Sequence, residues 1–171
     1  FEFRWHLEPG ESFQTPEALL AYSAEGLNGM SQAFHEVVRH HIVRGKFRDA
    51  VRPILVNNWE ATYFDFDDEK MDALAACAAD LGLELLVLDD GWFHGRRDDT
   101  SSLGDWQVDR RQWPQGLTPL IEHVHRRGMA FGLWVEPELV NPASELNRAH
   151  PDWALGPADP TLGRFQLILD L

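Results

Sequence analysis

The chain has 171 residues, a formal net charge of −13 and one cysteine. A chain of this length can bury a single hydrophobic core, its acidity disfavours nucleic acid or an anionic membrane as a partner, and one cysteine excludes a disulfide framework within the chain. We find neither a signal peptide nor an apolar run near the ~20 residues of a membrane span, so we expect a cytoplasmic protein with no membrane partner.

Residues 1–50 show a strand-like pattern and then a helical one. Residues 1–5 alternate apolar and polar side chains, as the last strands of a preceding β region do. Apolar residues recur at helical spacing over residues 26–40. His35 lacks the second histidine four positions later that a metalloprotease helix needs, so we expect no metal there.

From Arg52 onward, short apolar strands alternate with helices. The predicted strands are 53–57, 85–88, 129–134 and 165–169, and the predicted crossover helices are 67–81 and 116–127. Short βαβ spacing makes such strands parallel. Because an eight-stranded α/β barrel needs about 250 residues, residues 51–171 supply only about half of one, with about four parallel strands.

Two residue types give expectations about burial. Most of the seven tryptophans lie beside acidic residues, glycine or proline in predicted loops, so we expect them to face a ligand rather than a core. Cys77 lies in an alanine-rich helical stretch, and we expect it to be a small core residue.

The run Leu85–Leu88 ends in Asp89, Asp90, Gly91 and Trp92. In an α/β barrel the groups at the carboxyl ends of strands meet the substrate. Two carboxylates beside an indole suit a sugar, whose hydroxyls donate hydrogen bonds and whose C–H face stacks. A solvated Asp-Asp-Gly turn is the alternative. Three predicted strands in turn end in Asn-Trp-Glu, Asp-Asp-Gly-Trp and Trp-Val-Glu-Pro-Glu, and this recurrence favours a site.

Five motifs, in order along the chain, resemble those of the α-galactosidases of glycoside hydrolase family 36. They are segments 52–60, 88–92, 104–106, 132–138 and 148–153. The resemblance implies a longer enzyme with an N-terminal β-sandwich, a central (β/α)8 TIM barrel and a C-terminal β domain. Residues 1–50 would then be the linker from the sandwich, and residues 51–171 the N-terminal half of the catalytic barrel.

The resemblance also implies which residues bind substrate. Asp89 and Asp90 match carboxylates that accept hydrogen bonds from galactose, chiefly from its 4-OH and 6-OH. Trp59 and Trp134 match aromatic residues that line the sugar site, and Arg164 matches an arginine that reaches into it. No cofactor and no metal are implied.

The implied activity is retaining hydrolysis of terminal α-galactosides such as melibiose or raffinose, by a homo-oligomeric parent. The family's nucleophile, in a Lys-Trp-Asp motif, and its acid/base aspartate have no match here. Adjacent strand residues point to opposite faces, so Asp89 and Asp90 are a poor nucleophile and acid pair, and we assign them to binding. Asp170 is interpreted as a structural residue. We therefore predict that the isolated chain has no appreciable glycosidase activity.

Three alternatives stay open. The first is a related α-N-acetylgalactosaminidase or a raffinose-synthase-like galactosyl transferase. The second is a catalytically inactive galactose-binding or structural fragment, which the missing nucleophile favours. The third is a magnesium-dependent barrel using Asp89, Asp90, Glu136 and Glu138, which the surrounding tryptophans disfavour. An isolated half barrel has an open sheet edge, so we expect it to self-associate.

Overall fold

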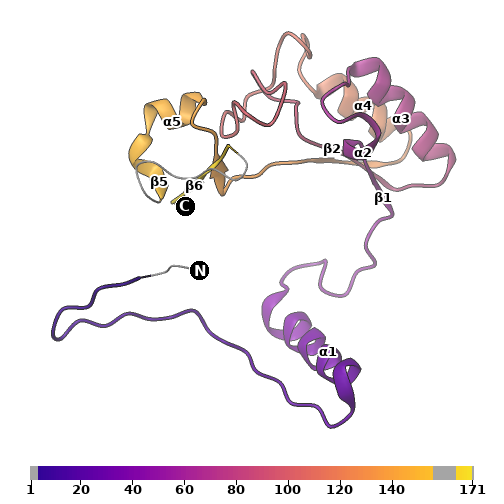
Figure 1. Ribbon diagram of the computed structural model, residues 1–171. Coiled ribbons are helices and arrows are strands. Elements are labelled where there is room, and N and C mark those ends of the chain that lie inside the picture. The colour runs from indigo at the N-terminus through magenta and orange to yellow at the C-terminus, as the bar shows by residue number, and fades with distance from the viewer. Residues whose placement is uncertain (1–3, 156–164, 171) are drawn as a thin grey trace. The chain divides into compact units, whose positions relative to one another are not determined.

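The computed structural model describes residues 4–155 and 165–170 (Figure 1). The chain divides into two compact units, Phe1–Arg52 and Pro53–Leu171. In the first unit, α1 (Gly26–Val37) continues directly into the π-helical turn η1 (Val38–Ile42), which confirms the predicted helix. Residues 4–25 contain no helix or strand, so the predicted strand is not seen at residues 4–5. A strand needs a neighbouring strand to pair with its backbone N–H and C=O groups, and an alternating sequence pattern does not by itself provide that neighbour.

The second unit is built on a parallel sheet of β1 (Leu55–Asn57), β2 (Leu85–Leu88) and β3 (Ala130–Leu133), in the order β1-β2-β3. The predicted strands 53–57, 85–88 and 129–134 are thereby confirmed. The register places Val56 opposite Leu86 and Leu86 opposite Phe131. The parallel α/β arrangement agrees with part of a barrel.

Two crossover helices lie side by side against the sheet (Figure 1). They are α3 (Asp68–Asp80) and α4 (Thr118–Arg126), and a single short turn of helix, α2 (Trp59–Thr62), follows β1. The carboxylate of Asp67 accepts the backbone N–H of Lys70 at 2.9 Å and so caps the first turn of α3. Both predicted crossover helices are therefore confirmed.

The core forms where the helices meet the sheet. Leu86 and Leu88 alternate with the partly buried Leu85 and Val87, so one face of β2 is buried against the helices. The core residues that surround this face from the helices and the following loops are Met71, Ala75, Ala78, Trp92, Phe93, Leu103, Trp113, Leu117, Leu120 and Val124.

Two expectations about burial were wrong in part. Trp92 and Trp113 are only 3% and 2% exposed and belong to the core, because the loop that carries them folds back over the sheet. Cys77 is exposed, because it lies on the outer face of α3, away from Met71 and Ala75. The angular position of a residue around the helix axis determines whether its side chain is buried, and an alanine-rich composition gives no information about that position.

The predicted fourth parallel strand is not confirmed. Residues 167–169 form β6 (Leu167–Leu169), which pairs antiparallel with β4 (Leu139–Val140) and with β5 (Ala154–Leu155) in a separate small sheet. Between β4 and β5 lie only α5 (Glu145–Ala149) and the 3-10 turn η2 (Pro151–Trp153). A parallel neighbour needs a crossover of a dozen residues or more, usually a helix. The described part of this connection has no helix of that length.

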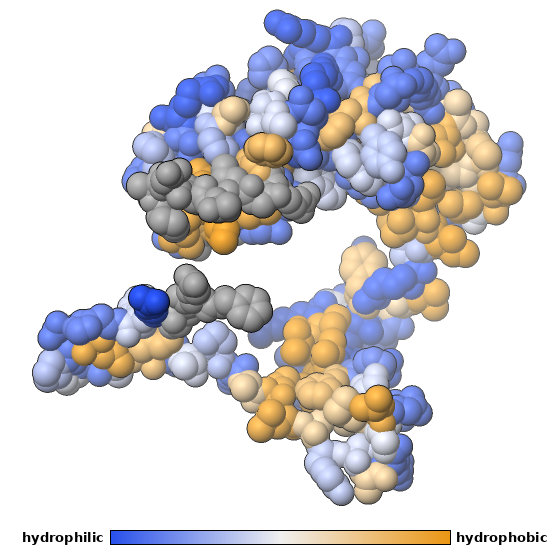
Figure 2. Space-filling model, in the orientation of Figure 1, coloured by the Kyte–Doolittle hydropathy of each residue, from blue (hydrophilic) through white to orange (hydrophobic). Residues whose placement is uncertain are grey.

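Apolar side chains reach the surface of the second unit (Figure 2). Within the described residues, β1 and β3 each pair with one neighbour in the parallel sheet. Leu55, Leu133 and Val135, on or just after these two strands, are 53%, 39% and 49% exposed. Among the described residues, no helix is both long and apolar enough to cross a membrane.

Candidate functional site

Polar and aromatic residues follow the three parallel strands where those strands end. Asn57 and Asn58 lie at the end of β1, Asp89 and Asp90 follow β2, and Trp134 follows β3. The backbone N–H of Trp134 donates to the carbonyl of Leu88 at 2.9 Å, which ties the ends of β2 and β3 together. The structure thus brings the ends of all three strands to one edge of the sheet, as expected for parallel strands.

Asp89 is partly buried and held on three sides. Its backbone N–H donates to Asn58 Oδ1 at 2.7 Å. Its carboxylate accepts the Asn57 Nδ2 amide on one oxygen and the backbone N–H of Asp90, at 2.7 Å, on the other. These bonds fix the direction of the carboxylate and leave acceptor capacity on both oxygens, because an ionised carboxylate has about four acceptor positions.

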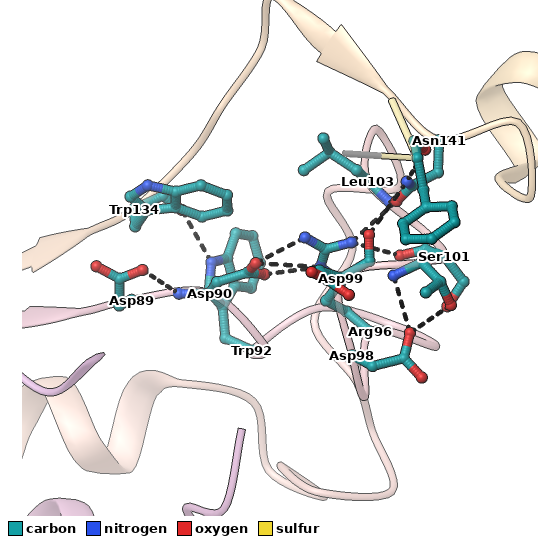
Figure 3. Close-up of polar contacts among 12 residues, drawn as sticks. Asp89, Asp90, Trp92, Arg96, Asp98, Asp99, Ser101, Leu103, Trp134 and Asn141 are labelled. Carbon is teal, nitrogen blue, oxygen red and sulfur yellow. Dashed lines mark hydrogen bonds and ion pairs between the residues drawn. The ribbon is translucent and has the colours of Figure 1, made fainter. Parts of the chain in front are cut away.

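Asp90 has a different environment, because it forms a buried ion pair with Arg96. The two residues are 6% and 1% exposed. Arg96 Nε lies 2.9 Å from Asp90 Oδ1, and Arg96 Nη2 lies 2.7 Å from Asp90 Oδ2. Figure 3 shows the Asp90 carboxylate directed at this guanidinium, away from the carboxylate of Asp89. The strand has already ended at Leu88, so the two carboxylates are placed by different loop contacts.

Sequence reasoning missed Arg96 and the buried Asn141 that contacts it. Arg96 Nη1 donates to Asn141 Oδ1 at 2.9 Å and to the carbonyl of Ser101 at 2.9 Å. Arg96 stands in a charge-rich loop where it resembles any solvated arginine. The available signal was the apolar run before Asp90, because a carboxylate buried at the end of such a strand needs a cation beside it.

The predicted aromatic residues lie at the strand ends in two separate settings. Trp59 is partly buried and makes edge-on contacts with Tyr63 and Phe64, at ring-centroid distances of 5.2 and 5.0 Å. Trp134 is partly buried, and its ring lies edge-on to Trp106 at 6.0 Å. Arg164 lies outside the described residues.

Trp134 is anchored to the core by Trp92. The indole N–H of Trp92 donates to the carbonyl of Trp134 at 2.9 Å. The ring of Trp92 stacks on that of Trp106 with centroids 6.3 Å apart and an interplanar angle of 26°. Trp92 is therefore a buried residue that holds the backbone of Trp134 in place, whereas the sequence predicted that it would face a ligand.

Two further features concern a carboxyl group in the loop after β2 and the possibility of a metal site. The Thr100 side-chain and backbone hydrogen bonds to Asp98 lower the pKa of the Asp98 carboxyl below its ordinary value of 3.8. Within residues 4–155 and 165–170, no group of three or more His, Cys, Asp or Glu side chains is placed to hold a metal ion. Both carboxylate oxygens of Asp90 contact the guanidinium of Arg96, which argues against the use of Asp90 as a magnesium ligand.

The melibiase family model matches residues 12–171 of the chain. The chain belongs to the melibiase family. It is 60% identical over 172 residues to the α-galactosidase AgaA of Geobacillus stearothermophilus, and 50% identical over 173 residues to Mel36A of Lactobacillus acidophilus. These matches cover 99% and 100% of this chain but 24% of each relative, so the chain spans about a quarter of the curated relatives' length.

Solved structures of melibiase-family relatives agree with this assignment. The crystal structure of the GH36 α-galactosidase AgaB from Geobacillus stearothermophilus superimposes with a TM-score of 0.84 at 61% identity, covering 96% of this chain and 23% of that one. A variant of AgaA in complex with stachyose superimposes with a TM-score of 0.84 at 60% identity, covering the same shares of the two chains. The resemblance to family 36 α-galactosidases is thereby confirmed.

Proposed function

We propose that this chain is part of a retaining α-galactosidase acting on terminal α-galactosides, and that it contributes galactose recognition. In this proposal, residues 51–171 belong to the N-terminal half of a (β/α)8 catalytic barrel, and residues 1–50 to the linker from an N-terminal β-sandwich. Variants of the relative AgaA have been crystallised with 1-deoxygalactonojirimycin, stachyose and raffinose. Oligosaccharides of the raffinose type are accordingly the substrates that we propose for this chain.

The observation that carries the proposal is the pre-oriented carboxylate of Asp89. It stands at the end of the central strand β2, is fixed by Asn57 and the backbone of Asp90, and keeps acceptor positions on a partly exposed side chain. A fixed acceptor can discriminate strongly between sugars that present a hydroxyl to it and sugars that do not. Trp59 and Trp134 stand at the ends of the flanking strands, where an aromatic ring can cover the apolar face of the sugar.

The geometry supports binding rather than bond cleavage by these carboxylates. Retention needs two carboxyl groups about 5 Å apart on opposite sides of the scissile bond, one attacking and one donating a proton. Both oxygens of the Asp90 carboxylate accept hydrogen bonds from Arg96, so this group is poorly placed to donate a proton to a leaving group. We therefore propose that Asp89 and Asp90 accept hydrogen bonds from galactose hydroxyls, and that the reacting carboxylates come from elsewhere in the parent enzyme.

An exchange experiment tests this function. The segment of AgaA that aligns with this chain is replaced by residues 1–171, and hydrolysis of raffinose is measured. We expect the exchange protein to be active and Asp89→Ala to lower kcat/KM by about 100-fold or more, because a buried sugar hydroxyl loses its charged partner. Asp80→Ala, which removes an exposed carboxylate at the end of α3, is the matched control and should leave kcat/KM unchanged.

Two outcomes contradict the proposal. One is a folded exchange protein without α-galactosidase activity, and the other is an Asp89→Ala variant as active as the Asp80→Ala control. Circular dichroism of each variant establishes folding.

The isolated chain is expected to have no glycosidase activity, because its sequence contains no Lys-Trp-Asp motif. The same observation favours a second candidate, a galactose-binding fragment without catalysis of its own. Calorimetric titration of the isolated chain with galactose and with glucose distinguishes the two, because galactose-selective binding without turnover supports the second. The cytoplasmic location and the homo-oligomeric parent stay predictions.

A further inference from the structure

We infer that Arg96 is a positioning residue for galactose recognition, which acts by aiming the one free acceptor position of Asp90 at a substrate hydroxyl. This inference rests on the proposed function. The motifs that resemble the family include Asp90 but not Arg96, so its role follows from the geometry of the buried ion pair and of the residues behind it.

Arg96 occupies most of the acceptor capacity of Asp90. Nε lies 2.9 Å from Oδ1 and 3.2 Å from Oδ2, and Nη2 lies 2.7 Å from Oδ2. A carboxylate has about four acceptor positions, so about one position, on Oδ1, remains for a substrate. The guanidinium therefore decides the direction in which Asp90 can accept.

Arg96 is itself held by a second buried residue. Its Nη1 donates to Asn141 Oδ1 at 2.9 Å, and Asn141 is fully buried. The Asn141 oxygen also accepts the backbone N–H of Leu103 at 2.8 Å, and its amide nitrogen donates to the carbonyl of Phe165 at 2.6 Å. Asn141 thus links the loop after β2 to the strand β4 and to the segment that leads into β6.

The rigidity of this network is the reason to assign it a positioning role. Each of the three guanidinium nitrogens of Arg96 donates at least one hydrogen bond, and the side chain is 1% exposed, so the guanidinium cannot turn without breaking several bonds. A lysine at this position would keep the charge but would present a point charge on a flexible stem instead of a planar fork. The carboxylate of Asp90 would then still have a cationic partner, but its orientation would no longer be fixed.

The same loop contains a matched ion pair that does not touch Asp90. Arg97, the next residue, pairs with the buried Asp109 and donates to Gln112 at 2.7 Å. Arg97→Lys therefore removes a guanidinium contact to a buried aspartate in the same loop, without removing any hydrogen bond to Asp90. Arg97→Lys is therefore the control that reports how kcat/KM changes when this loop is weakened but the Asp90–Arg96 ion pair is left intact.

The test measures kcat/KM in the exchange protein for three substrates: an aryl α-galactoside, its 4-deoxy analogue and its 6-deoxy analogue. Arg96→Lys should lower kcat/KM for the parent galactoside by about tenfold or more, which is the loss expected for a misdirected hydrogen bond to a charged group. For the deoxy analogue that lacks the hydroxyl bound by Asp90, the loss should largely disappear, as in a double-mutant cycle. Arg97→Lys should change all three substrates by the same small factor.

Each other outcome overturns the inference or its premise. A loss in Arg96→Lys that is equal for all three substrates shows a merely structural role, and an unchanged kcat/KM shows no role. A folded wild-type exchange protein without activity contradicts the proposed function itself. If Arg96→Lys does not fold, Asn141→Ser, which loosens Arg96 without altering charge, should show the same substrate pattern, and a uniform loss there overturns the inference.

Discussion

Replacing Asn141 by alanine should be among the most destabilising single changes in the second unit. The side chain makes three hydrogen bonds of 2.9 Å or less, to Arg96 Nη1, to the N–H of Leu103 and to the carbonyl of Phe165. Each buried group left without a partner costs about 1–3 kcal/mol, and partial relaxation reduces the sum. We expect the free energy of unfolding to fall by about 3–5 kcal/mol, a large fraction of the ~5–15 kcal/mol of a typical domain.

Urea unfolding followed by tryptophan fluorescence measures this loss, because Trp92 and Trp113 are buried in the core of the same unit. Asn147→Ala is the matched control, since the Asn147 side chain makes one hydrogen bond of 3.3 Å, to the carbonyl of Pro142. The control should lose less than about 1 kcal/mol. A loss for Asn141→Ala no larger than that of the control would refute the role of Asn141 as a structural link. Asn141→Ser should be intermediate and serves if the alanine variant does not fold.

Three other predictions concern a helix cap, a glycine and a carboxyl group. Asp67→Ala should lower the free energy of unfolding by about 1 kcal/mol, because it removes the N-cap of α3. Gly91→Ala should cost about 2–5 kcal/mol, because the residue has φ +105° and an added Cβ would lie 3.0 Å from the ring of Phe64. Thr100→Ala should raise the pKa of Asp98 toward 3.8, measured by NMR titration of the Asp98 carboxyl. Because the folded pKa of Asp98 is depressed, its small contribution to stability is present above the unfolded pKa and is lost as the pH falls through the folded value.

Control substitutions distinguish the stated cause of each effect from a general loss of stability. Asp68→Ala removes a first-turn charge without removing the cap, and should cost less than Asp67→Ala. Gly82→Ala shares a positive φ of +79° but has no atom within 4 Å of the added Cβ, so it should cost about 1–2 kcal/mol. Equal losses at Gly91 and Gly82 would contradict the steric reason. An Asp98 pKa that is the same in Thr100→Ala and in the wild type would contradict the role of the Thr100 hydroxyl.

Local patterns in the sequence were sufficient for the parallel sheet and its two crossover helices. The apolar run Leu85–Leu88 predicts β2, and the helix predicted over residues 67–81 matches α3 within a residue or two at each end. Such signals are local because a strand's alternation and a helix's caps depend on neighbours in the chain. The order of five motifs was likewise enough to recognise the family.

Contacts between residues far apart in the chain were decided by the tertiary structure. Arg96 and Asn141 are 45 positions apart, and nothing local distinguishes either from a solvated loop residue. The antiparallel pairing of β6 with β4 and β5 escaped prediction for the same reason, since an apolar run fixes neither the direction nor the identity of its partner. The order of amino acids specifies which residue types stand at the strand ends. Only the fold decided that Asp90 is buried against a guanidinium while Asp89 stays partly exposed, because burial and charge pairing depend on what the rest of the chain packs around each carboxylate.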